Sequence, residues 1–189
     1  MEYKVFISQF IKNPNFTGAI LPSSKKLCKK MMEGIDFNKA ECIVEYGPGT
    51  GVFTEELIKR RKKDTILIAI EYNEEFYDIL VNKFSGVDNL FIINDSAENI
   101  KEYLKVLEIN KVDYIVSGLP FTSLPSEVAE NILRNTKEIL SIHGVFITFQ
   151  YTLLKLKLFR RYFNLITLKR TFLNVPPAYV LICNNGKEG

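Results

Sequence analysis

The 189-residue chain has few of the residues that build metal sites and disulfide frameworks. Its single histidine is His143, and its three cysteines, Cys28, Cys42 and Cys183, form no close pair in the sequence. Protein metal sites usually draw on clusters of Cys and His, so we expect no metal cofactor. An odd number of cysteines without a secretory leader is typical of reduced thiols in a cytosol.

Long apolar runs and a strong excess of one charge are also missing. No apolar run approaches the length of a transmembrane helix, and the opening residues lack the hydrophobic region and cleavage site of a signal peptide. We therefore expect a cytoplasmic protein, with peripheral binding at the inner face of a membrane left open. The net charge of +3 is too small to argue for a nucleic-acid partner by itself.

Length and composition favour one folded domain. The chain is 47% hydrophobic and 25% charged, as expected of a protein with a full core. We expect residues 1–40 to form a helical amino-terminal cap and residues 41–189 to form the core of this domain.

Strand-like and helix-like patterns alternate from about residue 41 to residue 151. The strand-like apolar runs lie at 43–44, 66–70, 90–93, 114–116 and 145–149, and two more lie near 165–172 and 179–183. Such alternation predicts an α/β fold with a parallel sheet and helices on both of its faces.

The most informative segment is Glu45-Tyr-Gly47-Pro-Gly49-Thr-Gly51, which follows one apolar run and precedes an amphipathic segment. This pattern predicts a strand, a glycine turn and a helix. Glycines let the backbone pass close to a ligand, and the helix amino terminus offers free N–H groups. Glu71 ends the next apolar run, where a carboxylate can accept hydrogen bonds from ribose hydroxyls. The segment therefore predicts a site for a nucleoside-containing cofactor.

The glycine spacing differs from that of a dinucleotide-binding turn, G-x-G-x-x-G, because Val52 follows Gly51 directly. The carboxylate of Glu45 is unfavourable beside a pyrophosphate and favourable beside a cation. At these residues the chain resembles the class I S-adenosylmethionine-dependent methyltransferases, whose first motif is E-x-G-x-G-x-G. The resemblance implies a three-layer, Rossmann-like fold with a seven-stranded, mostly parallel sheet and a C-terminal antiparallel hairpin. It also implies S-adenosyl-L-methionine as cofactor and S-adenosyl-L-homocysteine as product.

Two later segments extend this resemblance. Asn94-Asp95-Ser96-Ala97 stands where the family places an acidic residue against the adenine amine, and Ser117-Gly118-Leu119-Pro120-Phe121 stands where its fourth motif lines the methyl-transfer site. The resemblance implies that the cofactor is bound by Glu45, Tyr46, Gly47, Gly49, Thr50, Gly51, Glu71, Tyr72, Asp95, Ser96 and Ala97, and that the acceptor is lined by Gly118, Leu119, Pro120 and Phe121. In this assignment Glu45 faces the methionine ammonium group, Glu71 holds the ribose and Asp95 frames adenine. No residue is assigned as the general base, although Tyr46 and Tyr72 are expected near the site.

Two groups within this class suggest different methyl acceptors. Segments 10–14, 18–24, 117–120 and 174–178 resemble bacterial phospholipid N-methyltransferases, which implies methylation of phosphatidylethanolamine. The ribosomal RNA adenine dimethylases carry Asn-Leu-Pro-Tyr or a close variant where this chain has Gly118-Leu-Pro-Phe121. The missing amide counts against an adenine acceptor, although Phe121 can still stack on a base. We therefore expect a phospholipid or membrane surface as the partner and keep RNA as the alternative.

Amphipathic and basic segments have more than one interpretation. A helix predicted over 3–12 packs on the core, closes over the cofactor or docks on a membrane. A second helix is predicted over 25–32, with Ser23 or Ser24 as its N-cap. The basic run 59–63 is typical of a solvated helix end. The basic, leucine-rich segment 151–163 is either a core helix with charged edges or a segment that contacts anionic lipid or phosphate.

Overall fold

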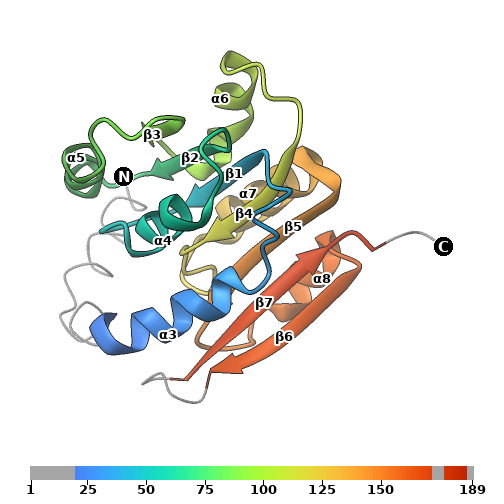
Figure 1. Cartoon of the computed structure of the whole chain (residues 1–189). Helices are drawn as coiled ribbons and strands as arrows, with labels where there is room; N and C mark the ends of the chain where they lie inside the picture. Colours follow the sequence, from blue (N-terminus) through green and yellow to red (C-terminus); the bar gives the residue numbers. More distant parts are fainter. Residues whose placement is uncertain (1–19, 172–176, 187–189) are drawn as a thin grey trace.

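The computed structural model describes residues 20–171 and 177–186, and the strands in these ranges form one sheet (Figure 1). The strands are β1 Cys42–Tyr46, β2 Ile66–Glu71, β3 Leu90–Asn94, β4 Val112–Ser117, β5 Leu140–Gln150, β6 Leu165–Thr171 and β7 Ala178–Asn184. Their order across the sheet is β3-β2-β1-β4-β5-β7-β6. Strands β1 to β5 pair in parallel, whereas β7 runs antiparallel to β5 and β6. The predicted fold, including the final antiparallel hairpin, is confirmed.

Helices cover both faces of the sheet. They are α3 Ile20–Met32, α4 Val52–Arg60, α5 Glu74–Lys83, α6 Ile100–Val106, α7 Ser126–Ile139 and α8 Leu156–Tyr162, with a 3₁₀ turn, η1, at Ala97–Asn99. Helices α3 and α4 pack on one face, and α6, α7 and α8 pack on the other (Figure 1). Because both faces are buried, the parallel strands appear in the sequence as continuous apolar runs rather than as alternating patterns.

The strand register brings the carboxyl ends of the parallel strands to one edge of the sheet. Tyr46, the last residue of β1, pairs with Ile70 of β2 and with Ser117 of β4. Glu71 pairs with Asn94 at the end of β3. The glycine turn, Glu71, Asp95 and the fourth motif therefore all lie at this edge, which is where ligands bind in open α/β sheets.

Helix α3 begins earlier than predicted. It starts at Ile20, so Ser23 and Ser24 lie within the helix and the prediction that either one caps it is wrong. Pro22 is compatible with the first turn, because the N–H that proline lacks has no partner within the helix there. The predicted helix over 3–12, the segments 10–14 and 18–19, and residues 174–176 lie outside the described residues, so the interpretations based on them stay predictions.

The basic segment 151–163 contains a helix that packs on the core. In α8 the side chains of Leu158 and Phe159 are buried, as is Phe163 directly after it. The ring of Phe163 stacks on Phe146 of β5, with ring centres 5.6 Å apart. The core-helix interpretation therefore holds for this face of α8, while Lys157 and Arg160 are exposed.

Candidate cofactor and acceptor site

The glycine turn after β1 has backbone conformations that other residues rarely adopt. The φ angles are +65° at Gly47, +57° at Gly49 and +80° at Gly51. A Cβ atom at Gly51 would lie 2.7 Å from the ring of Phe84, so α5 packs tightly against this end of the turn. At Gly49, by contrast, a Cβ atom would have no neighbour within 4 Å. The turn thus presents bare backbone to open space, as close approach of a ligand requires.

Glu71 connects the glycine turn to the loop after β2. Its side chain is buried, and its two carboxylate oxygens accept hydrogen bonds from the N–H groups of Gly49 at 3.0 Å and Asn73 at 2.9 Å. Burial raises the pKa of Glu71, and the backbone N–H groups of Asn73, Gly49 and Tyr72 oppose that rise. Each carboxylate oxygen can accept more than one hydrogen bond, so the group is fixed in place and still able to accept from ribose hydroxyls.

Glu45 is a fully buried carboxyl group beside α4. Within residues 20–171 and 177–186, neither of its oxygens has a hydrogen-bond partner, and neither has the hydroxyl of Thr54. Burial raises the pKa of Glu45 to about 8; the nearby hydroxyl and N–H of Thr54, although outside hydrogen-bond geometry, oppose the rise, and the charge of Glu71 adds to it. A buried carboxyl group without partners is costly, and a cationic ligand group nearby would relieve that cost.

Asp95 is held by three groups that follow it in the chain. Its oxygens accept hydrogen bonds from the Tyr103 hydroxyl at 2.7 Å, from the Asn99 amide at 3.0 and 3.1 Å, and from the Ser96 N–H at 2.6 Å. Burial raises the pKa of Asp95, but these hydrogen bonds outweigh burial and the pKa is lowered. Ser96 and Ala97 are buried at the start of η1. Asn99 and Tyr103 were not predicted as site residues, although Asn99 follows Asp95 by four residues and Tyr103 follows Asn99 by four, which is a helical spacing.

The three remaining predicted cofactor residues differ in their placement. The Tyr46 side chain is fully buried in the core, where the Thr136 hydroxyl lies 3.4 Å from its own, and burial raises its pKa. The structure therefore corrects the expectation that its phenol stands near the site; only its backbone does, because its carbonyl oxygen accepts from the Gly118 N–H at 2.8 Å. Tyr72 is half-buried after β2, and Thr50 is exposed in the glycine turn.

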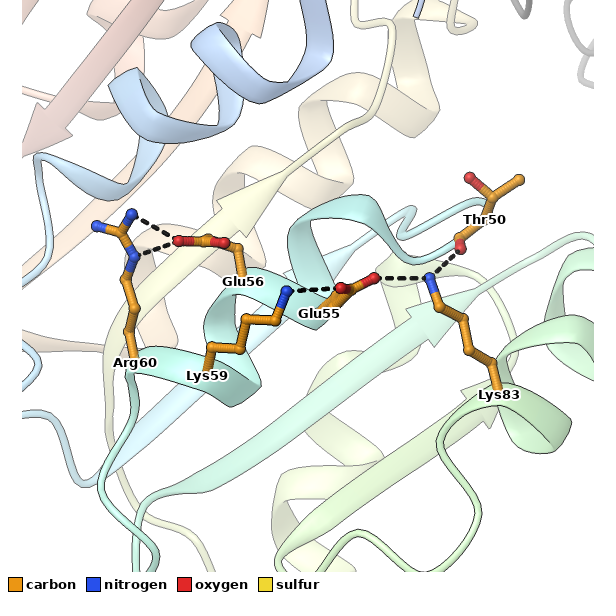
Figure 2. A network of polar contacts seen from close by, with 6 residues as sticks. All are labelled: Thr50, Glu55, Glu56, Lys59, Arg60 and Lys83. Atoms are coloured by element: carbon orange, nitrogen blue, oxygen red, sulfur yellow. Dashed lines mark hydrogen bonds and ion pairs between the residues drawn. The ribbon is translucent and has the colours of Figure 1, made fainter. Parts of the chain in front are cut away.

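An ion-pair network on the surface joins α5 to the glycine turn. Figure 2 shows the Lys83 ammonium group between the carbonyl oxygen of Thr50, at 3.4 Å, and the carboxylate of Glu55, at 3.1 Å. Glu55 also pairs with Lys59 at 2.6 Å, near the end of α4. The basic run 59–63 thus begins at a solvated helix end, as predicted. Exposed pairs of this kind contribute little stability.

The fourth motif packs directly on the glycine turn. A Cβ atom at Gly47 would lie 2.8 Å from the Leu119 side chain, and one at Gly118 would lie 2.7 Å from the Gly47 carbonyl oxygen. Gln150, buried at the end of β5, donates from its amide to the Leu119 carbonyl oxygen at 3.2 Å. Gln150 was not predicted, although its position at the end of the strand next to β4 is a signal for it.

The ring of Phe121, which the sequence predicted to line the methyl path, lies in a cluster of aromatic side chains. It is fully buried and packs edge-on against Phe159, with ring centres 5.1 Å apart, and against Phe146 at 6.1 Å. The ring therefore belongs to the core beneath the turn. Gly118 and Pro120 are partly exposed, and Leu119 is almost fully buried against Gly47.

The described residues contain neither a metal cluster nor a membrane-spanning helix. Among residues 20–171 and 177–186, no cluster of three or more His, Cys, Asp or Glu side chains is placed to hold a metal ion. Over the same ranges, no helix has both the length and the apolar character needed to cross a bilayer. All three cysteines are buried and unpaired, and burial raises the pKa of each thiol to about 12.

The site fits S-adenosylmethionine. Open backbone at Gly49, an anchored carboxylate at Glu71 and an unpartnered buried carboxyl at Glu45 suit a ribose and an ammonium group, whereas two carboxyl groups beside the turn disfavour a pyrophosphate. The N-methyltransferase NodS of Bradyrhizobium japonicum, solved with S-adenosyl-L-homocysteine, has the same fold: its TM-score is 0.74, with 11% identity over 98% of both chains. The fold and the site together define an S-adenosylmethionine-dependent methyltransferase.

Comparison of sequences places the chain within a family. The family described as ribosomal RNA adenine dimethylase matches residues 4–153, and the protein belongs to it. An ornithine lipid N-methyltransferase of Singulisphaera acidiphila is 28% identical over 99% of this chain and 98% of its own length. A ribosomal RNA small subunit methyltransferase A of a Sulfurihydrogenibium species is 35% identical over 52% of this chain, which spans only 37% of that relative.

Proposed function

We propose that this enzyme transfers methyl groups to the amino group of a membrane lipid head group of the phosphatidylethanolamine type. The observation that carries the proposal is the end-to-end likeness to an ornithine lipid N-methyltransferase, which covers 99% of this chain and 98% of that one. The ribosomal RNA methyltransferase relative instead extends well beyond the part that this chain matches. Phosphatidylethanolamine and ornithine lipid share one acceptor group, a primary amine on a lipid.

The proposed cofactor contacts follow from the geometry of the first three strand ends. The backbone of Gly47, Gly49 and Gly51 forms the cradle, and Glu71 accepts from the ribose hydroxyls. Asp95, kept ionised by its donors, accepts from the adenine amine, and Glu45 lies on the side of the methionine ammonium group. When bound, S-adenosylmethionine supplies a methyl group on a sulfonium that is already a good leaving group. The task left to the protein is alignment of the acceptor nitrogen.

The acceptor side supports an amine better than an adenine base. Position 118 has no side-chain amide to accept from the exocyclic amine of adenine, and the Phe121 ring is inside the core, where it has no free face for stacking. A lipid amine is largely protonated at neutral pH, as lysine is, and must lose a proton before it can attack. With the Tyr46 phenol buried, we assign that proton to water.

The test is transfer of a radiolabelled methyl group to lipids dispersed in detergent. We expect label in phosphatidylethanolamine or ornithine lipid and none in phosphatidylglycerol, which has no amine. The rate should rise with pH as the amine loses its proton. An enzyme that labels neither amine lipid contradicts the proposal.

Methylation of adenine in RNA is a second candidate, because the family that matches residues 4–153 is named for that reaction. It predicts RNA binding that weakens steeply with salt. It also predicts that the methylation rate does not rise at alkaline pH, since the adenine amine is not protonated at pH 7. Label found in RNA but in no lipid would favour this candidate.

A further inference from the structure

The loop between β5 and α8, residues 151–155, begins beside the acceptor side of the site. It follows the carboxyl end of β5, and therefore lies at the same edge of the sheet as the glycine turn and the fourth motif. Gln150, the residue just before the loop, donates to the Leu119 carbonyl oxygen. The loop and the fourth motif are thus joined by one buried hydrogen bond.

This loop exposes apolar side chains to solvent. Leu154 is 85% exposed and Tyr151 is 36% exposed. The loop nevertheless has a firm base, because α8 follows at Leu156 and buries Leu158 and Phe159. Single exposed apolar side chains are common on protein surfaces. Leu154 is singled out by its place at the edge of the sheet that holds the site and by the basic residues that follow it, a combination typical of segments that meet a lipid interface.

The charges around the loop favour an anionic partner. No Asp or Glu occurs from 151 to 163, whereas Lys155, Lys157 and Arg160 lie next to the apolar tip. On α7, which packs against α8, Glu127 is exposed in the first turn and Glu130 pairs with Arg161 at 3.1 Å, so Lys155, Lys157 and Arg160 still leave an excess of positive charge. Glu74 and Glu75 lie at the other end of the same edge, exposed in the first turn of α5. An apolar tip bordered by cations suits a bilayer with anionic head groups, in which the apolar group enters the interface and the ammonium groups meet phosphates.

We propose that residues 151–157, here called the docking lip, bind an anionic lipid bilayer by inserting Leu154 at its interface, with Lys155 and Lys157 on head-group phosphates. Docking in this orientation holds the acceptor side of the site, between the glycine turn and the fourth motif, against the membrane. The inference rests on the proposed function for its purpose, but docking itself does not depend on which amine is methylated.

The docking test uses the full chain and vesicles of phosphatidylglycerol and phosphatidylcholine, which contain no primary amine. Two changes in the lip, Leu154→Glu and Lys157→Glu, are each compared with a matched change at the opposite edge of the sheet, where the parallel strands begin. Ile142, near the start of β5, is 84% exposed, and Lys63 is exposed just after α4, so Ile142→Glu and Lys63→Glu are the controls.

Leu154→Glu should lower vesicle binding about tenfold, as loss of one inserted leucine predicts. Lys157→Glu should lower it about fivefold or more, and the two controls should bind as the unchanged protein does. Leu154→Ser should also weaken binding, which separates loss of insertion from simple charge repulsion. Equal binding by all variants overturns the docking lip, as does binding to neutral vesicles that equals binding to anionic ones.

Detergent assays keep this inference apart from the proposed function. In micelles no bilayer has to be docked, so Leu154→Glu should methylate dispersed amine lipid at the normal rate. Lip-dependent vesicle binding without methylation of any amine lipid supports the docking lip and contradicts the proposed function. If the enzyme methylates amine lipid and substitution of Leu154 leaves vesicle binding unchanged, the proposed function is supported and the docking lip is overturned.

Discussion

A Cβ atom on Gly118 would lie 2.7 Å from the carbonyl oxygen of Gly47, so the turns after β4 and β1 meet backbone to backbone. The Gly118 N–H also donates to the Tyr46 carbonyl oxygen, which fixes the same contact from the other side. The turn that cradles the cofactor and the turn that lines the acceptor therefore form one unit. Displacing either turn moves both halves of the site.

Gly118→Ala should impair cofactor binding and methyl transfer together. The added methyl group would have to push against backbone, and overpacking of this kind costs about 1–3 kcal/mol. We expect a loss of affinity for S-adenosylhomocysteine of about fivefold to about a hundredfold, measured by calorimetry. The control is Gly34→Ala, in the turn after α3, where the crowding atom is the flexible end of the Ile147 side chain. Normal affinity in Gly118→Ala would show that the two turns move independently.

Glu71→Ala should weaken cofactor binding by about 1–3 kcal/mol, since it removes charge-assisted hydrogen bonds. It also removes the acceptor for the Gly49 N–H, so the glycine turn loses its link to the loop after β2. The exposed Glu75 in α5 provides the matched control, and Glu75→Ala should bind the cofactor normally. An unchanged dissociation constant in Glu71→Ala would remove Glu71 from the cofactor site.

The strands could be predicted from the sequence because both faces of the sheet are buried, so that each parallel strand is a continuous apolar run. The turn after the first strand could be predicted because its glycines have a distinctive spacing. The same burial hides the direction of individual side chains. In β1, Val44 and Tyr46 belong to the core on one face of the sheet and Ile43 to the core on the other, yet the apolar run itself does not show which face each residue takes. Tyr46 was therefore expected near the site and is found in the core.

Contacts between distant segments were equally out of reach. The ring of Phe121 is drawn inward by Phe146 and Phe159, which come from β5 and α8, and no local pattern reveals those neighbours. Gln150 supports the fourth motif across the sheet for the same reason. Only Asn99 and Tyr103, four and eight residues after Asp95, had a periodic signal that sequence reasoning can use.

Tyr103→Phe should weaken binding of the adenine moiety by about 0.5–1.5 kcal/mol, the usual contribution of one hydrogen bond. Loss of the Tyr103 hydroxyl also lets the pKa of Asp95 rise, because that hydrogen bond stabilises the ionised carboxylate. The ionised acceptor is lost as pH falls through the pKa of Asp95, so the acid decline in binding should begin at a higher pH in the variant.

The measurement for Tyr103 is the affinity for S-adenosylhomocysteine and for an analogue lacking the adenine amino group, each over a range of acidic pH. Tyr103→Phe should bind the analogue almost as well as the unchanged protein does. Tyr162→Phe, at the end of α8, should change neither affinity. Equal losses for both ligands would mean that Tyr103 acts on general stability and not on the adenine contact.

Glu45 should make stability depend on pH in a defined direction. Its pKa in the folded protein is about 8, whereas the ordinary value is 4.5. Between these pH values the unfolded chain loses the proton and the folded protein keeps it, so the free energy of unfolding falls as pH rises. The stabilising contribution of protonated Glu45 is therefore complete only below pH 4.5. The loss amounts to roughly 3–5 kcal/mol above pH 8.

Glu45→Gln removes this titration and keeps the shape of the side chain. In urea unfolding, the free energy of unfolding of the variant should increase relative to that of the unchanged protein as pH rises from 5 to 8. Above pH 8 the difference should stay constant. Glu33→Gln gives the opposite control, because the hydrogen bond from Lys169 lowers the pKa of Glu33 and its contribution is lost as pH falls. If the gain of Glu45→Gln were the same at every pH, Glu45 would be ionised in the folded protein, and a partner for its charge would have to lie within the site.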